Sequence, residues 1–152
     1  MALCVAAIVA ATMGAASAEP ADGAAGRWLV QGGFGVIAIA PCGESICGRI
    51  DWMKPPANGP ATTARDAHNP DPAVRQRPIC GLTILYGFRH EKRGRWEAGN
   101  IYDPDSGQTY QANITLEDTN HLRLRGYIGV PLFGASQIWT RVDNELPQCH
   151  TG

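Results

Sequence analysis

Apolar and polar residues alternate along most of the chain with a period of two. Tyr110, Ala112, Ile114 and Leu116, for example, share one side of their segment, and Gln, Asn and Thr residues separate them. This period is typical of a β-strand that has one buried and one exposed face. The pattern predicts eight strands, at residues 26–31, 34–40, 47–53, 81–88, 95–102, 110–116, 121–128 and 134–142.

Short turns connect most of these predicted strands, and the basic segment 90–94 is expected to be one of them. Eight short strands joined by turns favour an antiparallel up-and-down barrel or a sandwich. We expect the all-β barrel, because closure leaves no sheet edge unpaired. The small residues Ala98, Ala112 and Gly126 are expected to face inward and to leave space for a ligand.

One long connection, between the third and fourth predicted strands, interrupts the alternation. Its segment 66–81 concentrates prolines, acids and bases. Asp71 is predicted to cap a short helix that begins at Pro72. Long loops in compact domains are commonly functional, so we expect a lid across the barrel mouth. The alternative is structural, with Arg77 paired to Asp66 to hold the loop in place.

The two ends of the chain differ in composition from the predicted strands. Residues 1–18 combine a short apolar run with Ala16-Ser17-Ala18, which indicates a secretory signal peptide. Residues 19–25 are expected to be a flexible lead, and 26–152 a single barrel domain. An uncleaved anchor is the alternative for 1–18, although the run is short for a membrane span. No transmembrane span is expected in the mature chain, and a periplasmic or secreted location is predicted.

Charge and cysteine usage narrow the partners and the chemistry. The formal net charge is −1, and no basic face is evident, so nucleic acid is not an expected partner. Four cysteines remain after signal cleavage, which suits disulfides in an oxidising compartment. Cys42 and Cys47 are spaced to face each other across a hairpin, which leaves Cys80 to pair with Cys149.

Metal and catalytic motifs are weak in this sequence. No C-x-x-C pair is present, and the segment 103–107 lacks the pattern of a calcium loop, so neither metal nor cofactor is expected. No serine lies in a nucleophile motif. The carboxylates Asp51, Glu97 and Asp103 are an open candidate set for glycoside hydrolysis, if the fold brings them together.

Two terminal motifs resemble the signature of lipocalin-like (calycin) barrels. Gly26-x-Trp28 begins the first predicted strand, and Trp139-Thr140-Arg141 lies in the last. The resemblance implies that Trp28 packs under Arg141 and that the pair seals one barrel end. Such stacking of a guanidinium on an indole is a cation–π contact.

Longer motifs resemble a bacterial secreted family called domain of unknown function 2147. They are NPDPAVRQRPICG, WEAGNIYDPDSGQTY and RGYIGVPLFGASQIWTR, together with the spacing of Cys42, Cys47 and Cys80. The resemblance covers nearly the whole mature chain. It implies a lipocalin-like barrel in a bacterial envelope or secretome, and no established activity.

These observations favour a small-ligand-binding barrel without enzymatic activity. An amphipathic or hydrophobic ligand is expected to meet polar residues of the lid and aromatic residues of the barrel. The candidate ligand-binding residues are Asp66, Asn69, Asp71, Arg77, Trp52, Tyr86, Trp96 and Tyr110. Arg77 is the expected anchor for a carboxylate or phosphate head group. The alternatives are a cell-envelope interaction module with a packed interior and, third, a hydrolase of envelope glycans.

Overall fold

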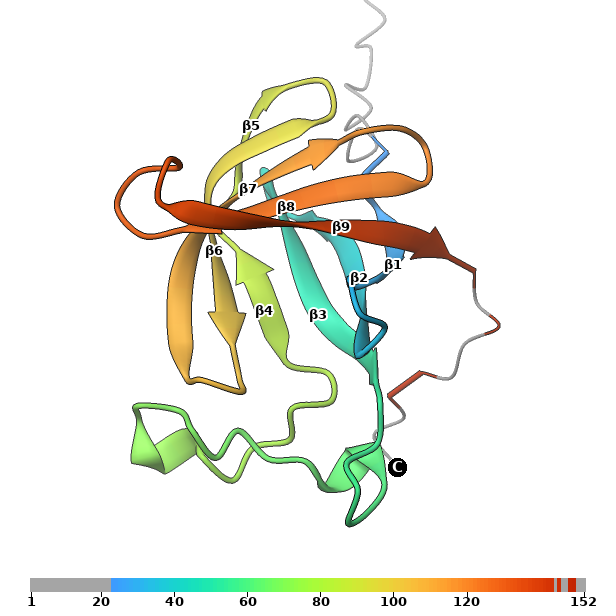
Figure 1. Cartoon of the computed structure of the whole chain (residues 1–152), viewed down its shortest axis with the longest axis vertical. Coiled ribbons are helices and arrows are strands. Elements are labelled where there is room, and N and C mark those ends of the chain that lie inside the picture. The colour runs from blue at the N-terminus through green and yellow to red at the C-terminus, as the bar shows by residue number, and fades with distance from the viewer. Residues whose placement is uncertain (1–22, 144, 146–147, 150–152) are drawn as a thin grey trace, which may run out of the picture.

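The computed structural model describes residues 23–143, 145 and 148–149, and it is built almost entirely of β-strands (Figure 1). The predicted signal peptide lies outside the described residues, and the predicted lead overlaps them only at 23–25. Nine strands are present in the described part of the chain: β1 (Gly26–Leu29), β2 (Gly35–Cys42), β3 (Ser45–Met53), β4 (Thr83–Tyr86), β5 (Arg89–Lys92), β6 (Arg95–Asp103), β7 (Gln108–Leu116), β8 (His121–Tyr127) and β9 (Gly134–Val142).

The strands form one closed antiparallel barrel. Their order is β4-β3-β2-β1-β9-β8-β7-β6-β5, and a further pairing of β4 with β6 closes the sheet on itself. Eight strands therefore make the wall, and β5 is an extra strand on β6. The predicted eight-stranded barrel is confirmed. Closure satisfies the hydrogen-bonding groups that an open sheet would leave at its edges.

The extra strand arises where the sequence predicted a basic turn. The fourth strand ends at Tyr86, because Gly87 has a φ of +75°, which lies outside the extended region. The chain then re-enters the sheet as β5 and pairs with the first residues of β6, so that His90 lies opposite Trp96. The prediction of a turn over 90–94 was therefore wrong for 90–92.

A cluster of buried apolar side chains, with Phe88 and Trp96 among its aromatic members, fills much of the barrel. The pairing of β6 with β7 shifts register between Trp96 and Gly99. Ala98, in this bulge, has a φ of +53° and is exposed, so its predicted inward position was wrong. Gly99 faces inward instead, and a Cβ there would collide with the Phe88 ring. Ala112 is buried in the core as expected.

Trp28 and Arg141 seal one end of the barrel. Trp28 is fully buried, and the guanidinium carbon of Arg141 lies 4.2 Å from the centre of its ring. Arg141 also donates hydrogen bonds to the carbonyl oxygens of Thr119, Ala25 and Gly23. A cation stacked on an indole and bound to three carbonyls is held in one geometry. The stacking that the sequence motifs implied is therefore present.

Both predicted disulfides are present. The hairpin disulfide joins Cys42 to Cys47 across the β2–β3 turn, with Cα atoms 5.8 Å apart. The C-terminal disulfide joins Cys80 to Cys149, with Cα atoms 5.4 Å apart. It ties the end of the described chain to the loop before β4. Within the described residues, no helix has the length and apolar character needed to cross a membrane.

The long loop between β3 and β4 spans 54–82 and lies outside the barrel end, in green at the bottom of Figure 1. It carries two short 3₁₀ helices, η1 (Ala61–Thr63) and η2 (Pro72–Val74). Asp71 caps η2 as predicted, because its side chain accepts a hydrogen bond from the backbone N–H of Ala73 at 2.9 Å. The loop leaves β3 at Met53, which is paired with Gly35 at the end opposite Arg141.

Candidate binding site

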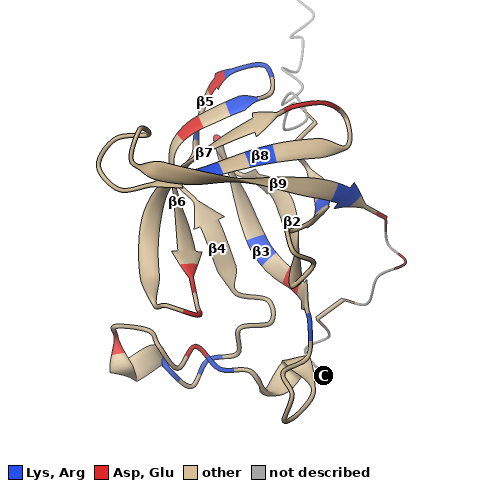
Figure 2. Cartoon of the chain, viewed as in Figure 1, with Lys and Arg blue, Asp and Glu red and all other residues tan. Residues whose placement is uncertain are grey.

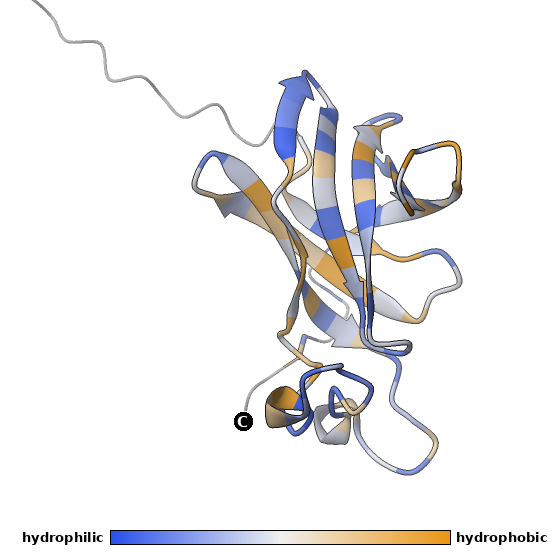
Figure 3. Ribbon diagram, turned by 90° about the vertical axis from the view of Figure 1, so that its left-hand side faces the viewer, coloured by the Kyte–Doolittle hydropathy of each residue, from blue (hydrophilic) through white to orange (hydrophobic). Residues whose placement is uncertain are grey.

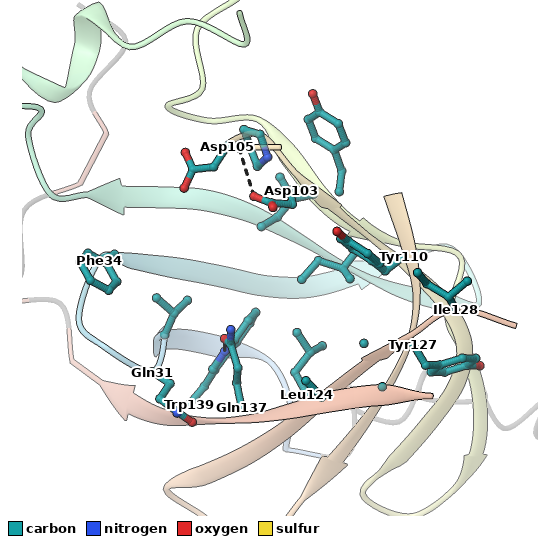
Figure 4. Close-up of a pocket in the computed structure, with 18 of the residues that line it drawn as sticks. Gln31, Phe34, Asp103, Asp105, Tyr110, Leu124, Tyr127, Ile128, Gln137 and Trp139 are labelled. Atoms are coloured by element: carbon teal, nitrogen blue, oxygen red, sulfur yellow. Dashed lines mark hydrogen bonds between the residues drawn. The ribbon is translucent and has the colours of Figure 1, made fainter. Parts of the chain in front are cut away.

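An open cavity of about 720 Å³ occupies the barrel end opposite Trp28 and Arg141. Figure 4 shows its walls, which come from the ends of several strands and the turns between them. Aromatic and aliphatic side chains dominate. The lining residues are Val30, Gln31, Phe34, Ile84, Ile101, Tyr102, Asp103, Pro104, Asp105, Tyr110, Leu124, Gly126, Tyr127, Ile128, Phe133, Gly134, Ala135, Gln137 and Trp139.

Trp139 and Leu124 form part of the inner wall, and Gly126 leaves room beside them. A Cβ added at Gly126 would meet its nearest heavy atom, in Ile101, only at 3.9 Å. The expectation that Gly126 leaves internal space is therefore supported. At this wall position no side chain takes up space in the cavity.

Two glutamine side chains hold this part of the wall in place. The Trp139 indole N–H donates to the Gln137 side-chain oxygen at 2.9 Å. The Gln31 side-chain oxygen accepts from the backbone N–H of Ile138 at 2.9 Å and so joins the β1–β2 turn to β9. Because both oxygens already accept hydrogen bonds from wall residues, these two glutamines support the cavity wall.

The polar rim of the cavity is acidic. Asp103, the last residue of β6, and Asp105, in the turn to β7, both line it (Figure 4). The Asp103 carboxylate accepts from the backbone N–H of Asp105 at 3.1 Å and from the Ser106 hydroxyl at 2.6 Å. None of the described residues that line the cavity is a lysine or an arginine. The local potential at the mouth is therefore negative.

The candidate ligand-binding residues of the sequence lie in several places. Tyr110 lines the cavity, and the other seven lie outside its lining. Trp96 is buried in the core, where its ring lies 5.7 Å from that of His90. Tyr86 is 40% exposed at the end of β4, and Trp52 is half-buried on β3. Asp66, Asn69, Asp71 and Arg77 all belong to the β3–β4 loop.

Asp66, Asn69 and Arg77 of the loop form one cluster, in which the carboxylate of Asp66 is fully buried. Its Oδ1 accepts from the Tyr102 hydroxyl at 2.5 Å. Its Oδ2 accepts from the Asn69 amide and from Arg77 Nε, each at 2.8 Å. The Arg77 guanidinium also lies 5.9 Å from the Tyr102 ring centre. We call these four residues the Asp66 cluster.

Protonation in the cluster follows from these contacts. Burial acts to raise the pKa of Asp66, but the hydrogen bonds from Tyr102, Asn69 and Arg77 outweigh it, so the pKa lies below its ordinary value. Burial, together with the bond to Asp66, raises the pKa of Tyr102. At neutral pH the cluster therefore holds a carboxylate, a phenol and a guanidinium. This structural role of Arg77 is the alternative that the sequence left open.

The Asp66 cluster joins the long loop to the cavity through one side chain. Tyr102 lines the cavity, while its hydroxyl binds Asp66. Beside it, Gly107 lies so close to the loop that a Cβ would collide with the carbonyl of His68. No residue of 54–82 lines the cavity. The loop therefore supports the wall of the cavity from behind, and it does not cross the mouth as the sequence predicted.

The open candidate set for hydrolysis is dispersed. Asp51 is buried and paired with Arg27 at 2.7 Å, Glu97 pairs with Arg95 at 2.8 Å, and Asp103 binds its own turn. Among the described residues, no group of three or more His, Cys, Asp or Glu side chains is arranged to hold a metal ion. Each of the three carboxylates is thus engaged with a partner of its own, and the alternative of a glycan hydrolase gains no support from them.

Several cavity residues were missed from the sequence, among them Phe34, Ile128, Phe133 and Trp139. One signal was available in the segment 128–133, IGVPLF. It is an apolar run where a connection between strands is normally polar. Inward-facing strand residues such as Trp139 gave no such signal, since inward alternation alone does not separate core from cavity.

The architecture defines the class of protein. A closed eight-stranded antiparallel barrel, sealed at one end by an arginine over a tryptophan and hollow at the other, is a lipocalin-like barrel. The chain belongs to the bacterial family described as "Uncharacterized protein conserved in bacteria (DUF2147)", whose model matches residues 26–141. The family resemblance noted in the sequence is thereby confirmed.

A solved structure supports the same fold. Protein HP1028 from Helicobacter pylori, described as belonging to the lipocalin family, is similar with a TM-score of 0.70 and 16% sequence identity. The match covers 80% of this chain and 84% of that chain. At this identity the likeness shows the fold alone. No curated protein matches the chain.

Proposed function

We propose that this protein binds a small hydrophobic or amphipathic molecule in the open end of its barrel, without catalysing a reaction. The observation that carries the proposal is the cavity of about 720 Å³ with its aromatic and aliphatic walls. Binding sites for small molecules commonly have a volume of about 300–1,000 Å³, apolar walls and a few polar groups. A module with a packed interior fits this barrel less well, because Gly126 keeps part of the wall open.

The charge of the rim favours a ligand with a neutral or cationic head. Asp103 and Asp105 are the charged residues of the described lining, and both are acidic. Arg77, the anchor expected for an acidic head, is already bound to Asp66. An anionic head at the mouth would face two carboxylates without a cation. We therefore propose an apolar body that carries an amine or hydroxyl groups.

A periplasmic or secreted location forms part of the proposal. The two disulfides support it, because such bonds persist in oxidising compartments. Because the family is bacterial, the oxidising compartment would be the periplasm or the medium. The predicted signal peptide over 1–18 agrees with this reading.

The test is a fluorescence titration with the neutral apolar dye N-phenyl-1-naphthylamine, followed by displacement with two molecules that share one alkyl chain. Dodecylamine should displace the dye at lower concentration than dodecanoate. We expect a difference of about fivefold, equivalent to about 1 kcal/mol, because the rim carboxylates are partly solvated. Equal displacement, or stronger displacement by dodecanoate, would contradict the proposed head chemistry.

A cavity-filling variant tests the location of binding. Gly126→Leu places a side chain in the cavity, where a Cβ has room, and should weaken dye binding at least tenfold. Gln111→Leu is the matched control, because Gln111 is exposed on the neighbouring strand and does not line the cavity. If Gly126→Leu folds and binds the dye as the wild type does, ligands do not occupy this cavity.

A further inference from the structure

The connection between β8 and β9, residues 128–133, exposes a set of large apolar side chains to solvent. The exposed fractions are 71% for Ile128, 50% for Val130, 79% for Leu132 and 70% for Phe133. Figure 3 shows this connection as a strongly hydrophobic loop that projects from the barrel. Contiguous apolar surface of this kind is uncommon on a free protein and marks an interaction site.

The apolar loop is held in a defined shape. Phe133 N–H donates to the Val130 carbonyl at 3.0 Å, and Ile128 N–H donates to the Phe133 carbonyl at 3.2 Å. Arg125 Nε donates to the carbonyl of Pro131 at 2.7 Å. The backbone therefore presents these side chains outward in one arrangement. The four apolar side chains are therefore exposed while the loop is folded and hydrogen-bonded.

A basic groove of about 550 Å³ adjoins the apolar loop on the outer face of the barrel. Arg89, Arg95, Arg123 and Arg125 line it, and Glu97 is the acidic residue of its lining. Figure 2 shows basic positions on β5 and β8, which carry three of these arginines. The positive charge of the groove is a local feature, since the chain as a whole has a net charge of −1.

The groove and the apolar loop form one continuous surface. Pro131 lies in the loop and also lines the groove, and Arg125 lines the groove while it binds Pro131. Arg95 is paired with Glu91 at 2.9 Å and with Glu97 at 2.8 Å, and Arg123 is paired with Glu117 at 2.9 Å. Both arginine side chains nevertheless remain more than 40% exposed. Arginines next to projecting apolar side chains match a surface that is anionic outside and apolar beneath.

We propose that this surface docks on an anionic lipid bilayer. The apolar loop enters the interface between head groups and acyl chains, and the arginines of the groove contact lipid phosphates. Apolar burial together with attraction to anionic lipids is how peripheral proteins bind membranes. The charge complementarity of the groove selects a bilayer over an uncharged apolar partner.

Docking would also bring one edge of the cavity to the bilayer, because Ile128 and Phe133 line the cavity mouth. A hydrophobic ligand could then pass between bilayer and cavity with little exposure to water. This consequence rests on the proposed function, whereas the docking does not. The two are separable because Val130 and Leu132 belong to the loop and lie outside the cavity lining.

The experiment is cosedimentation of the disulfide-bonded mature protein with vesicles of phosphatidylcholine, with and without phosphatidylglycerol. Wild type should bind the vesicles that contain phosphatidylglycerol, and added salt should release it. The double variant Arg89→Gln/Arg123→Gln should bind roughly 30-fold more weakly, equivalent to about 2 kcal/mol. The matched control Lys54→Gln/Arg65→Gln removes the same charge from the β3–β4 loop and should bind as wild type does.

The loop is tested by Val130→Ser/Leu132→Ser, which should abolish vesicle binding and leave dye binding in the cavity unchanged. Both side chains are exposed, so the urea midpoint should also stay at the wild-type value. Failure of wild type to bind anionic vesicles would overturn the proposal, as would full binding by the loop variant. If wild type sediments in the absence of vesicles and the loop variant does not, the surface binds a second copy of the chain instead.

Discussion

The Asp66 cluster predicts a measurable loss of stability on the replacement Asp66→Asn. The substitution keeps the shape of the side chain but removes the charge that Arg77 pairs with. It also replaces one of the two acceptor oxygens, of which Oδ1 binds Tyr102 and Oδ2 binds Asn69 and Arg77. Breaking a buried ion pair from one side costs about 3–5 kcal/mol. The Arg77 side chain is 39% exposed and can be rehydrated, so we expect the lower value, about 3 kcal/mol.

The assay is urea denaturation at a series of pH values. With a slope of about 1.5 kcal/mol per molar urea, a loss of about 3 kcal/mol lowers the midpoint by about 2 M. The folded-state pKa of Asp66 lies below the ordinary value of 3.8. Its carboxylate therefore stabilises the fold above that value, and the contribution is lost as the pH falls through the folded-state pKa. The gap between wild type and Asp66→Asn should narrow below pH 3.8.

Glu44→Gln provides the control, because Glu44 is exposed in the β2–β3 turn. This substitution is expected to leave the urea midpoint unchanged at neutral pH. A gap for Asp66→Asn that stays constant down to acidic pH would refute the reasoning from the carboxylate charge. Equal urea midpoints for wild type and Asp66→Asn at neutral pH would show that the Asp66 cluster does not contribute to stability.

Two further predictions concern the closed end and the disulfides. Arg141→Ala should lower the free energy of unfolding, measured in urea, by about 1–2 kcal/mol more than a typical surface change, and an unchanged midpoint would contradict the stacking on Trp28. Replacing both cysteines of the C-terminal disulfide by serine should cost about 4 kcal/mol, against about 2 kcal/mol for the hairpin disulfide, because the closed segments differ in length, 69 against 5 residues. Equal costs would contradict the loop-entropy explanation.

Much of the fold could be predicted from the sequence, because inward alternation is a local signal with one structural meaning. It failed where backbone geometry interrupted the alternation. The pairing of β3 with β4 shifts register between Gly48 and Arg49, and in β4 Leu85 is buried while Tyr86 is exposed. The bulge at Ala98 turns that residue outward. Neither break changes composition or polarity, so periodicity alone could not locate them.

The candidate site was harder to predict, for a physical reason. A cluster of acids, bases and amides in a loop has the composition of a recognition site, but Asp66, Asn69 and Arg77 satisfy one another. The cavity instead draws on strand ends and turns that are far apart in the sequence, such as Phe34, Tyr110 and Phe133. Only the closure of the barrel brings such positions together.

The position of Tyr102 links two parts of the molecule thermodynamically. One side of this residue belongs to the cavity wall, and its hydroxyl belongs to the Asp66 cluster. If a ligand binds more tightly when the loop holds Tyr102 in place, the ordered loop increases the binding free energy of the ligand. By reciprocity, the bound ligand stabilises the ordered loop by the same free energy. A ligand in the barrel would thus slow the local opening of the β3–β4 loop, and with it the hydrogen exchange of the loop amides, without touching the loop.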